Sequence, residues 1–328
     1  MKAVFLDKDE SAVNSVFSES QREYLGAKFG VPERVYTVDD LKEMHEVEFI
    51  FSTWGMPVLT REQITEYLPK LKAVFYAAGS VQTFARPFLE CGVRVFSAWQ
   101  ANAVPVAECA VSEILLSTKG FWYLAGRCKK DYAGAHEDMQ SFSGNFGAKV
   151  GILGYGAIAK IVVRELKRHD IEVFVSAPDF TEEDEKSTGA IKSDMKYIFE
   201  NCSVISNHIA DNARTKGIIN AAFIGSMKPY STFINTARGA QVDENALINK
   251  LKSDPSVTAL LDVTYPEPPE SGSELYTLPN CILTPHFAGS SGREVHRMAQ
   301  YMIEEAERLL GGKRLRYEVT MEMLERMA

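Results

Sequence analysis

Short apolar segments alternate with helix-forming patterns along nearly the whole of the 328-residue sequence. The apolar segments are typical of buried strands, and they are Ala3 to Leu6, Phe49 to Ser52, Ala73 to Ala77, Lys149 to Leu153, Glu172 to Ser176, Ser203 to Asn207, Thr232 to Asn235, Ala259 to Val263 and Ile282 to Thr284. Strands that alternate with helices form parallel sheets covered by helices. We therefore expect an α/β fold, and the chain length favours two domains.

Two segments between or after these strands carry further information. Asp131 to Gly147 is polar and rich in Gly and Ser, so we expect a loop there. The last strong helical pattern stops at Gly311 and Gly312, and its apolar stripe is expected to pack against the core. The residues of this stripe are Val295, Met298, Ala299, Met302, Ile303, Ala306, Leu309 and Leu310.

The composition argues against several classes of protein. A net charge of −8 opposes attraction to nucleic acid or to anionic lipid. The apolar run at the start is too short for a secretory signal, and no run approaches the roughly 20 apolar residues of a membrane span. The cysteines are odd in number and contain no C-x-x-C pair, so we expect reduced thiols in the cytoplasm and no metal site. They are Cys91, Cys109, Cys128, Cys202 and Cys281.

A glycine-rich turn follows the strand Lys149 to Leu153. The turn reads Gly154-Tyr155-Gly156-Ala157-Ile158-Ala159, and a helical pattern follows it. The first glycine permits a tight turn, the second lets backbone approach a pyrophosphate, and the helix N-terminus presents free N–H groups to the anion. We predict a dinucleotide site at Gly154, Gly156, Ala157 and Ile158; the alternative is an ordinary strand-helix turn that binds nothing.

The end of the next strand bears on the choice of dinucleotide. An NAD site commonly holds Asp or Glu there, whereas this chain has Ala177, followed by Asp179. No arginine follows that would pair with a 2′-phosphate, and the acidic stretch Glu182 to Glu185 would repel one. We therefore expect NADH to be preferred over NADPH.

Three later segments place polar residues at predicted strand ends, where open α/β sheets bind their ligands. Arg238 is a permanent cation with a fork suited to a carboxylate. His286 changes protonation near neutral pH, and Glu267 is suited to hold its ring and favour the imidazolium. Taken singly, each residue has an alternative explanation. Arg238 could form a surface ion pair, His286 could be a core histidine, and Glu267 could be a solvated turn carboxylate. Together they suit a hydride transfer coupled to a proton transfer.

These motifs, in this order, resemble the D-isomer-specific 2-hydroxyacid dehydrogenase family, which includes D-glycerate dehydrogenases and glyoxylate/hydroxypyruvate reductases. The resemblance runs from about Leu71 to the end of the last helix. The segments that carry it are Ala77 to Ser80, Asn102 to Glu108, the phosphate turn, Asn235 to Asp243, Asp262 to Pro268 and Thr284 to Ser290.

The resemblance implies a role for each matching residue. Arg238 would bind the substrate carboxylate and carbonyl oxygen, His286 would donate or accept the proton, and Glu267 would orient His286. Asp262 would accept a hydrogen bond from the nicotinamide carboxamide. The other implied cofactor contacts are Ala177, His208, Thr236, Ala237 and Gly289, and the other implied substrate contacts are Trp54, Ala78, Gly79 and Ser80.

The resemblance also implies two Rossmann-like domains with parallel sheets. The outer, substrate domain is discontinuous, with residues 1–100 plus 288–328, and the dinucleotide-binding domain has residues 101–287. A homodimer is expected. We predict NAD(P)H-dependent reduction of a small 2-oxoacid to the D-2-hydroxy acid, and the reverse reaction. The alternative is a dinucleotide-sensing scaffold or transcriptional co-regulator built on the same fold.

The resemblance also implies that the loop Thr53 to Val58 faces the distal end of the substrate. It contains Trp54 and Met56 but no Lys or Arg, so it would leave a phosphate group unpaired. We therefore expect hydroxypyruvate, glyoxylate or a modestly apolar 2-oxoacid to be reduced well and phosphohydroxypyruvate poorly. The alternative is that Trp54 only packs against its neighbours.

Overall fold

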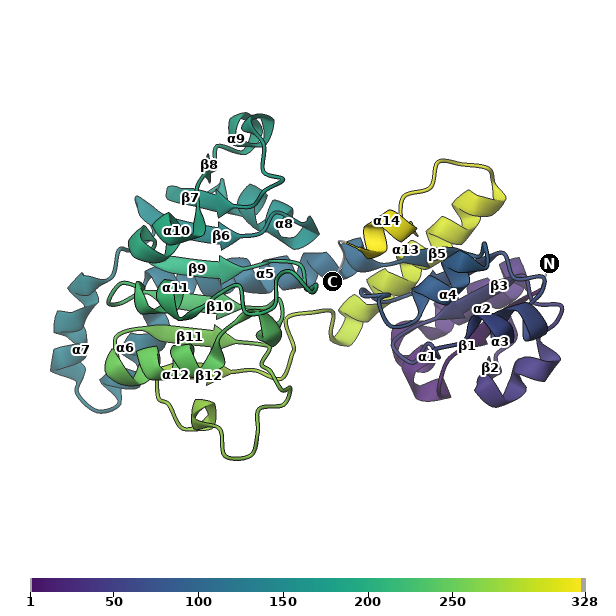
Figure 1. Cartoon of the computed structure of the whole chain (residues 1–328), viewed down its shortest axis with the longest axis horizontal. Coiled ribbons are helices and arrows are strands. Elements are labelled where there is room, and N and C mark those ends of the chain that lie inside the picture. Colours follow the sequence, from purple (N-terminus) through teal and green to yellow (C-terminus); the bar gives the residue numbers. More distant parts are fainter. Residues whose placement is uncertain (1, 326–328) are drawn as a thin grey trace. The chain divides into compact units, whose positions relative to one another are not determined.

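The computed structural model describes residues 2–325, which form two compact units (Figure 1). The first unit is Met1–Asn102 with Ser290–Ala328, and the second is Ala103–Gly289. Each unit contains a mainly parallel sheet with helices on both faces. The predicted α/β fold with two Rossmann-like sheets is therefore confirmed.

The sheet of the first unit has the strand order β13-β5-β4-β3-β1-β2, in which only β13 is antiparallel to its neighbour. Its strands are β1 (Ala3–Leu6), β2 (Val35–Tyr36), β3 (Phe49–Ser52), β4 (Ala73–Tyr76), β5 (Arg94–Ser97) and β13 (Glu318–Val319). Because successive side chains of a strand point to opposite faces, Ala3 and Phe5 join one core cluster while Val4 and Leu6 join the other.

Helices cover both faces of this sheet. One face packs against α1 (Glu10–Val16), α2 (Glu19–Phe29) and α13 (Val295–Leu310). The other packs against the 3-10 helix η1 (Val38–Glu43), α3 (Arg61–Tyr67), α4 (Ala85–Glu90) and α14 (Met321–Leu324). As predicted, α13 ends before Gly311, and its stripe is buried from Val295 to Ala306, although Leu310 is half exposed.

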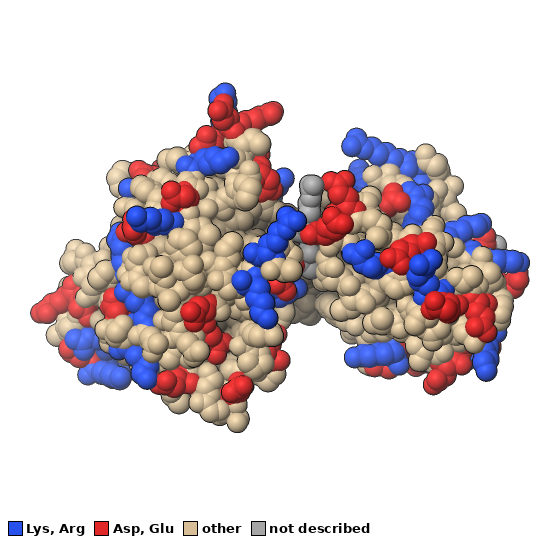
Figure 2. All heavy atoms as spheres, in the orientation of Figure 1, with Lys and Arg blue, Asp and Glu red and all other residues tan. Residues whose placement is uncertain are grey.

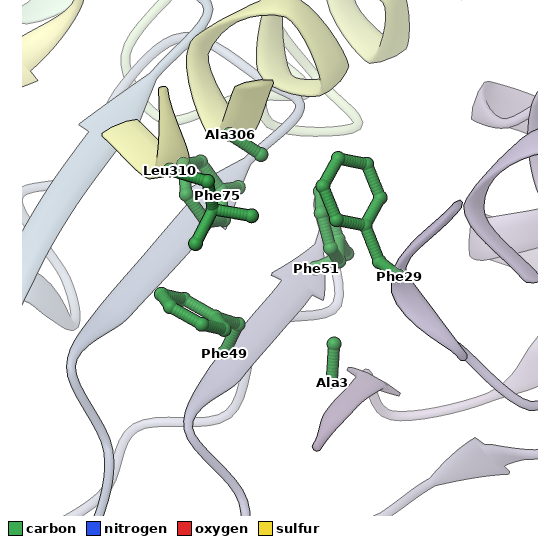
Figure 3. Close-up of a pocket in the computed structure, with 7 residues that line it drawn as sticks. All are labelled: Ala3, Phe29, Phe49, Phe51, Phe75, Ala306 and Leu310. Atoms are coloured by element: carbon green, nitrogen blue, oxygen red, sulfur yellow. The ribbon is translucent and has the colours of Figure 1, made fainter. Parts of the chain in front are cut away.

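Phenylalanines from neighbouring strands fill the space beneath α13 (Figure 3). The ring centroids of Phe51 and Phe75 are 5.1 Å apart, and those of Phe75 and Phe96 are 5.0 Å apart. The small hollow that remains between Phe49, Phe75 and Leu310 has no room for a water molecule. It is part of the packed core rather than a ligand site.

The sheet of the second unit has the order β12-β11-β10-β9-β6-β7-β8 and is parallel throughout. Its strands are β6 (Ala148–Leu153), β7 (Ile171–Ser176), β8 (Ile191–Lys192), β9 (Val204–Asn207), β10 (Thr232–Asn235), β11 (Thr258–Leu261) and β12 (Cys281–Leu283).

One face of the second sheet packs against α5 (Trp99–Thr118) and α8 (Ala157–Leu166). The opposite face packs against α10 (Met195–Asn201), α11 (Ala221–Gly225) and α12 (Glu244–Ser253). The remaining elements are α6 (Phe121–Cys128), α7 (Tyr132–Asp138), α9 (Glu182–Thr188) and the 3-10 helices η2 (Met139–Ser141), η3 (Gly239–Gln241), η4 (Glu274–Tyr276) and η5 (Gly292–Glu294), the last of which lies in the first unit.

The prediction of a loop over Asp131 to Gly147 is wrong for its first half, which contains α7 and η2. The side chain of Asp131 caps α7 by accepting from the N–H of Gly134 at 3.0 Å. Tyr123 and Arg127 of α6 both donate to Asp138 at the end of α7. These contacts stabilise a short helix whose composition alone suggested a loop. Among residues 2–325, no helix is both long and apolar enough to cross a bilayer.

Candidate active site

The carboxyl ends of the second unit's strands lie along one edge of its sheet, because all of them are parallel. The chain starts this sheet at β6 and continues on both sides of it, to β7 and to β9, so a crevice is expected where these strands end. The predicted residues that follow strand ends on this edge are Gly154, Ala177, His208, Thr236, Ala237, Arg238, Asp262 and His286.

The turn after β6 has the backbone that a pyrophosphate site requires. Gly154 has φ +86°, and a Cβ there would lie 2.6 Å from the carbonyl oxygen of His208. A Cβ at the exposed Gly156 would have no atom within 4 Å, so space is open beside the turn. Helix α8 starts at Ala157 and continues through Ile158, and no side chain caps its first N–H groups. These N–H groups are therefore available to an anion.

Two buried polar atoms at this edge of the sheet have no hydrogen-bond partner among the described residues. They are Nδ1 of His208 and Oγ1 of Thr236. The other ring nitrogen of His208 lies 2.9 Å from Oγ of Ser206, and burial lowers the pKa of His208 to about 4, so the ring is neutral. Unpaired buried polar atoms are costly. A dinucleotide that supplies hydrogen-bonding groups would remove this cost, so the residues present fit such a cofactor.

The end of β7 carries no charged group of its own. Ala177 is buried, Asp179 is exposed, and the acidic first turn of α9 projects at the tip of the second unit (Figures 1 and 2). Lys160 is a cation that the sequence analysis did not consider: its Nζ lies 5.2 Å from the ring centroid of Tyr155. Asp184 has a lowered pKa, chiefly because Thr181 donates hydrogen bonds to it, with a smaller contribution from Lys160.

His286 and Glu267 form a close pair at the edge of the second sheet. Nδ1 of His286 lies 2.6 Å from Oε1 of Glu267, and their side chains are 47% and 41% exposed. This contact leaves Nε2 of His286 free to meet a ligand. The two residues are 19 positions apart in the chain, so only the fold brings them together.

Asp262 shapes the loop that carries His286, which has φ +55°. Its Oδ1 accepts from Oγ1 of Thr284 at 2.7 Å and from the N–H of Phe287 at 2.8 Å, and its Oδ2 accepts from the N–H of Ala288 at 3.0 Å. A carboxylate accepts about four hydrogen bonds. Asp262 therefore keeps room for about one further donor, as its predicted contact with a carboxamide would need.

Arg238 extends from the end of β10 and is partly exposed. Its Nη1 donates to the carbonyl of Ala237 at 2.7 Å, and no ion pair joins it to a carboxylate within residues 2–325. A Cβ at the following Gly239 would lie 2.0 Å from the backbone carbonyl carbon of Thr264. Only glycine allows the loops after β10 and β11 to pack this closely. The guanidinium is therefore an unneutralised cation on a rigid loop.

The first unit holds the remaining predicted substrate contacts at the carboxyl ends of its own strands. Ala78, Gly79 and Ser80 follow β4, where Oγ of Ser97 donates to the carbonyl of Ala78 at 2.9 Å and to that of Gly79 at 2.5 Å. Ser80 is exposed, and Trp54 after β3 is 52% exposed. Met56, in contrast, is buried in the core of this unit.

Two residues that shape the Trp54 loop were missed by the sequence analysis. Asp7 is fully buried at the end of β1; it accepts from the N–H of Thr53 at 3.0 Å and from Oγ of Ser52 at 3.2 Å, and burial is the main cause of its raised pKa. The backbone N–H of Lys8 donates to the carbonyl of Gly55 at 2.9 Å. The pattern of β1 identifies neither residue, because the contacts join segments 45 or more positions apart.

Glu113 of α5 is a further missed residue. It lies beside Ala110 and Ile114, which face the sheet, and its Oε2 is buried without a hydrogen-bond partner among residues 2–325. Burial, with a smaller contribution from Asp262, raises the pKa of Glu113 to about 7. The signal in the sequence was a carboxylate among apolar residues at helical spacing, which also fits an exposed position at the edge of the stripe.

Comparison with known proteins decides the family. Residues 114–288 match the family model described as "D-isomer specific 2-hydroxyacid dehydrogenase, NAD binding domain", which covers more than half of the chain. The chain belongs to this family. Both the predicted family and the prediction of NAD as cofactor are thereby confirmed.

Curated relatives in the family carry several different names. The chain is 31% identical over 61% of its length to "Putative 2-hydroxyacid dehydrogenase YoaD" of Bacillus subtilis, covering 59% of that protein. It is 29% identical over 68% of its length to the (S)-sulfolactate dehydrogenase of Chromohalobacter salexigens, covering 72% of it. It is 32% identical over 77% of its length to the D-3-phosphoglycerate dehydrogenase of Haemophilus influenzae, covering 62% of it. The matches thus span between 59% and 72% of these relatives.

Solved structures support the fold over nearly the whole chain. The apo D-mandelate dehydrogenase of Rhodotorula graminis superposes with a TM-score of 0.79 at 23% identity, with 97% of both chains covered. The D-lactate dehydrogenase of Lactobacillus jensenii gives a TM-score of 0.73 at 19% identity, with 98% of this chain and 100% of that chain covered. At these identities the likeness establishes the shared architecture.

Proposed function

We propose that this member of the family interconverts a small 2-oxoacid and its D-2-hydroxy acid with NAD as the redox partner. The observation that carries the proposal is the His286–Glu267 pair, at 2.6 Å, on the same sheet edge as the phosphate turn and the unneutralised Arg238. A proton donor, an anion-binding cation and a dinucleotide turn are the groups that this reaction needs.

In this proposal, Arg238, His286 and Glu267 each have a separate role in the reaction. Arg238 holds the substrate carboxylate and polarises the carbonyl oxygen through its fork of N–H donors. NADH, when bound at the phosphate turn, supplies the hydride. His286 gives the proton on Nε2 to the carbonyl oxygen as the carbon is reduced, and takes it back in the oxidation. Glu267 fixes the orientation of the ring through Nδ1.

We assign the substrate role to residues 1–100 plus 288–328 and the dinucleotide role to residues 101–287. In the first, backbone N–H groups of Gly79 and Ser80 hold the carboxylate, with Ala78 beside them and Trp54 facing the substrate tail. In the second, Gly154, Gly156, Ala157 and Ile158 hold the pyrophosphate. The remaining cofactor contacts are Ala177, His208, Thr236, Ala237, Asp262 and Gly289.

We expect NADH to be preferred over NADPH. The support is the absence of any arginine near Ala177 in the sequence, together with the acidic start of α9. Nζ of Lys160 lies 5.2 Å from the ring centroid of the turn's Tyr155, and the charges of Lys160 and Asp184 attract each other.

We expect short uncharged or modestly apolar tails to be accepted. The exposed indole of Trp54 supports this, and the loop from Thr53 to Val58 holds no cation. Lys8 lies against Gly55 and is a cation that could pair with a distal anion. If phosphohydroxypyruvate is reduced efficiently, a Lys8→Met variant tests whether Lys8 pairs with its phosphate. Loss of that activity in the variant would assign the pairing to Lys8, and retained activity would assign it to another group.

The test is a panel of 2-oxoacids assayed with NADH and with NADPH. The panel contains glyoxylate, hydroxypyruvate, phenylpyruvate and phosphohydroxypyruvate, and oxidation of the reduced cofactor is followed by absorbance. We expect turnover with NADH that is lost in Arg238→Ala, while NADH binding, measured by fluorescence, is retained. Inactivity of the wild-type protein on the whole panel with both cofactors would overturn the proposal and favour a dinucleotide-sensing scaffold.

We also propose a homodimer in the cytoplasm. Large apolar side chains are exposed in and around α6 and α7, and burying them against a second copy would remove them from water. They are Leu116, Phe121, Tyr132, Met139 and Phe146. Light scattering on the wild-type protein and on Phe121→Ser tests this: we expect a dimer that the substitution weakens, and a wild-type monomer at micromolar concentration would refute it.

A further inference from the structure

Three buried amide side chains lie directly behind Arg238. Asn207 ends β9, Asn235 ends β10 and Gln241 ends η3, and each is at most 1% exposed. Asn207 and Asn235 are paired across the two strands in the sheet register. Nδ2 of Asn207 donates to Oδ1 of Asn235 at 3.0 Å and to Oε1 of Gln241 at 2.8 Å.

These amides also hold the backbone of the loop that carries Arg238. Nδ2 of Asn235 donates to the carbonyl of Arg238 at 3.1 Å, and Oδ1 of Asn235 accepts from the N–H of Ala237 at 3.1 Å. Asn235 therefore holds two peptide groups of this loop, the 236–237 group and the 238–239 group that follows the Arg238 Cα.

Gln241 joins the same loop to Ile209, which follows β9. Its Nε2 donates to the carbonyl of Ile209 at 2.8 Å, while the N–H of Ile209 donates to Oδ1 of Asn207 at 3.2 Å. The three amides thus form a closed set of hydrogen bonds between two strand ends. A buried polar network whose members are all satisfied favours one geometry, because any shift breaks several bonds in a low-dielectric interior.

We infer that Asn207 and Gln241 are positioning residues for the substrate carboxylate, acting through Asn235 and the backbone of Arg238. The inference rests on the proposed function, in which Arg238 binds that carboxylate. A bidentate Arg–carboxylate contact depends on where the guanidinium starts, and a displacement of about 1 Å at a reacting group can cost up to roughly 100-fold in rate. Neither amide side chain needs to touch the substrate for this effect.

The test uses Gln241→Met and Asn207→Asp. Methionine keeps the size of Gln241 and removes its donor and acceptor, whereas aspartate keeps the shape of Asn207 and removes the two N–H bonds. We expect KM for glyoxylate, or for the best substrate of the panel, to rise roughly 10-fold or more, with a smaller change in kcat. The affinity for oxamate, a 2-oxoacid analogue that is not reduced, should weaken in parallel.

The matched control is Asn280→Leu. Asn280 is another buried amide of the same sheet; its Nδ2 donates to the carbonyls of Leu251 at 3.0 Å and Val257 at 2.8 Å, at the amino ends of the strands. The Asn280→Leu substitution should lower the melting temperature of the protein without raising KM for the 2-oxoacid. If Gln241→Met and Asn207→Asp behave like this control, the network is only structural and the inference is wrong.

Two further outcomes are also decisive. Should either single variant fail to fold, the paired variant Asn207→Leu with Gln241→Met replaces both members of the Asn207–Gln241 hydrogen bond by apolar groups of similar shape, so that neither side chain leaves the other unpaired. A normal KM and oxamate affinity in that folded pair would refute the inference. A wild-type protein that binds NADH but turns over no 2-oxoacid would instead count against the proposed function itself.

Discussion

Replacing Glu113 by glutamine should change how the stability of the protein depends on pH. The carboxyl lies on the buried face of α5, and burial raises its pKa from an ordinary 4.5 to about 7. In the unfolded chain Glu113 loses its proton near 4.5, whereas in the folded chain it keeps the proton until about pH 7. The contribution of Glu113 to the stability of the folded wild-type protein is therefore fully present below pH 4.5, and it is lost as the pH rises to about 7.

The size of the effect follows from the gap between the two values. A gap of about 2.5 pH units, from 4.5 to about 7, at about 1.4 kcal/mol per unit gives a loss of about 3.5 kcal/mol above pH 7. Glutamine has nearly the same shape and does not titrate. For a unit of this size, about 3.5 kcal/mol corresponds to a melting temperature difference on the order of 10 °C.

The assay is thermal unfolding followed by circular dichroism at pH 5, 6, 7 and 8. We expect the melting temperature of the Glu113→Gln variant to rise relative to that of the wild type from pH 5 to pH 7. This difference in melting temperature should level off near pH 8. The control is Glu108→Gln, which removes an exposed carboxylate from the same helix. A difference between wild type and Glu113→Gln that is the same at pH 5 and pH 8 would refute the reasoning.

Three other changes have expected outcomes. Gly239→Ala would place a Cβ 2.0 Å from the Thr264 backbone and should cost about 3 kcal/mol of stability, measured by thermal melting; an unchanged melting temperature would contradict the close packing. Glu267→Gln keeps a partner for His286 but removes the charge, so kcat should fall roughly 100-fold or more while NADH binding persists; unaltered kcat would exclude the pair from proton transfer. Ala177→Asp should increase the kcat/KM ratio of NADH over NADPH roughly tenfold, and a ratio that falls would show that this position does not face the ribose.

The sequence predicted those parts of the molecule that depend on short segments. The apolar run before Gly154 and the helical pattern after it identified β6, the turn and α8, because a tight turn, a free helix N-terminus and an apolar stripe are all local properties. The long stripe from Val295 identified α13 and its end for the same reason. Motif order identified the family, which the comparisons confirmed.

Short elements whose stability comes from partners were not predicted. The two-residue strands β2, β8 and β13 exist only through pairing with β1, β7 and β5, and α7 forms where composition suggested a loop. Nothing within so few residues favours a strand or a helix strongly enough to be recognised, because the decisive hydrogen bonds come from distant segments.

The sequence by itself determined the chemical groups of the candidate site and the strand ends that carry them. Only the tertiary structure decided which groups meet: the contact of His286 with Glu267, the three hydrogen bonds of Asp262 to the 284–288 loop, and the amide network behind Arg238. The tertiary structure also decided that Met56 is buried and that burial raises the pKa of Glu113. The physical reason is that turn geometry and periodicity act over a few residues, whereas burial and pairing of polar groups depend on strands that the chain reaches only after many intervening residues.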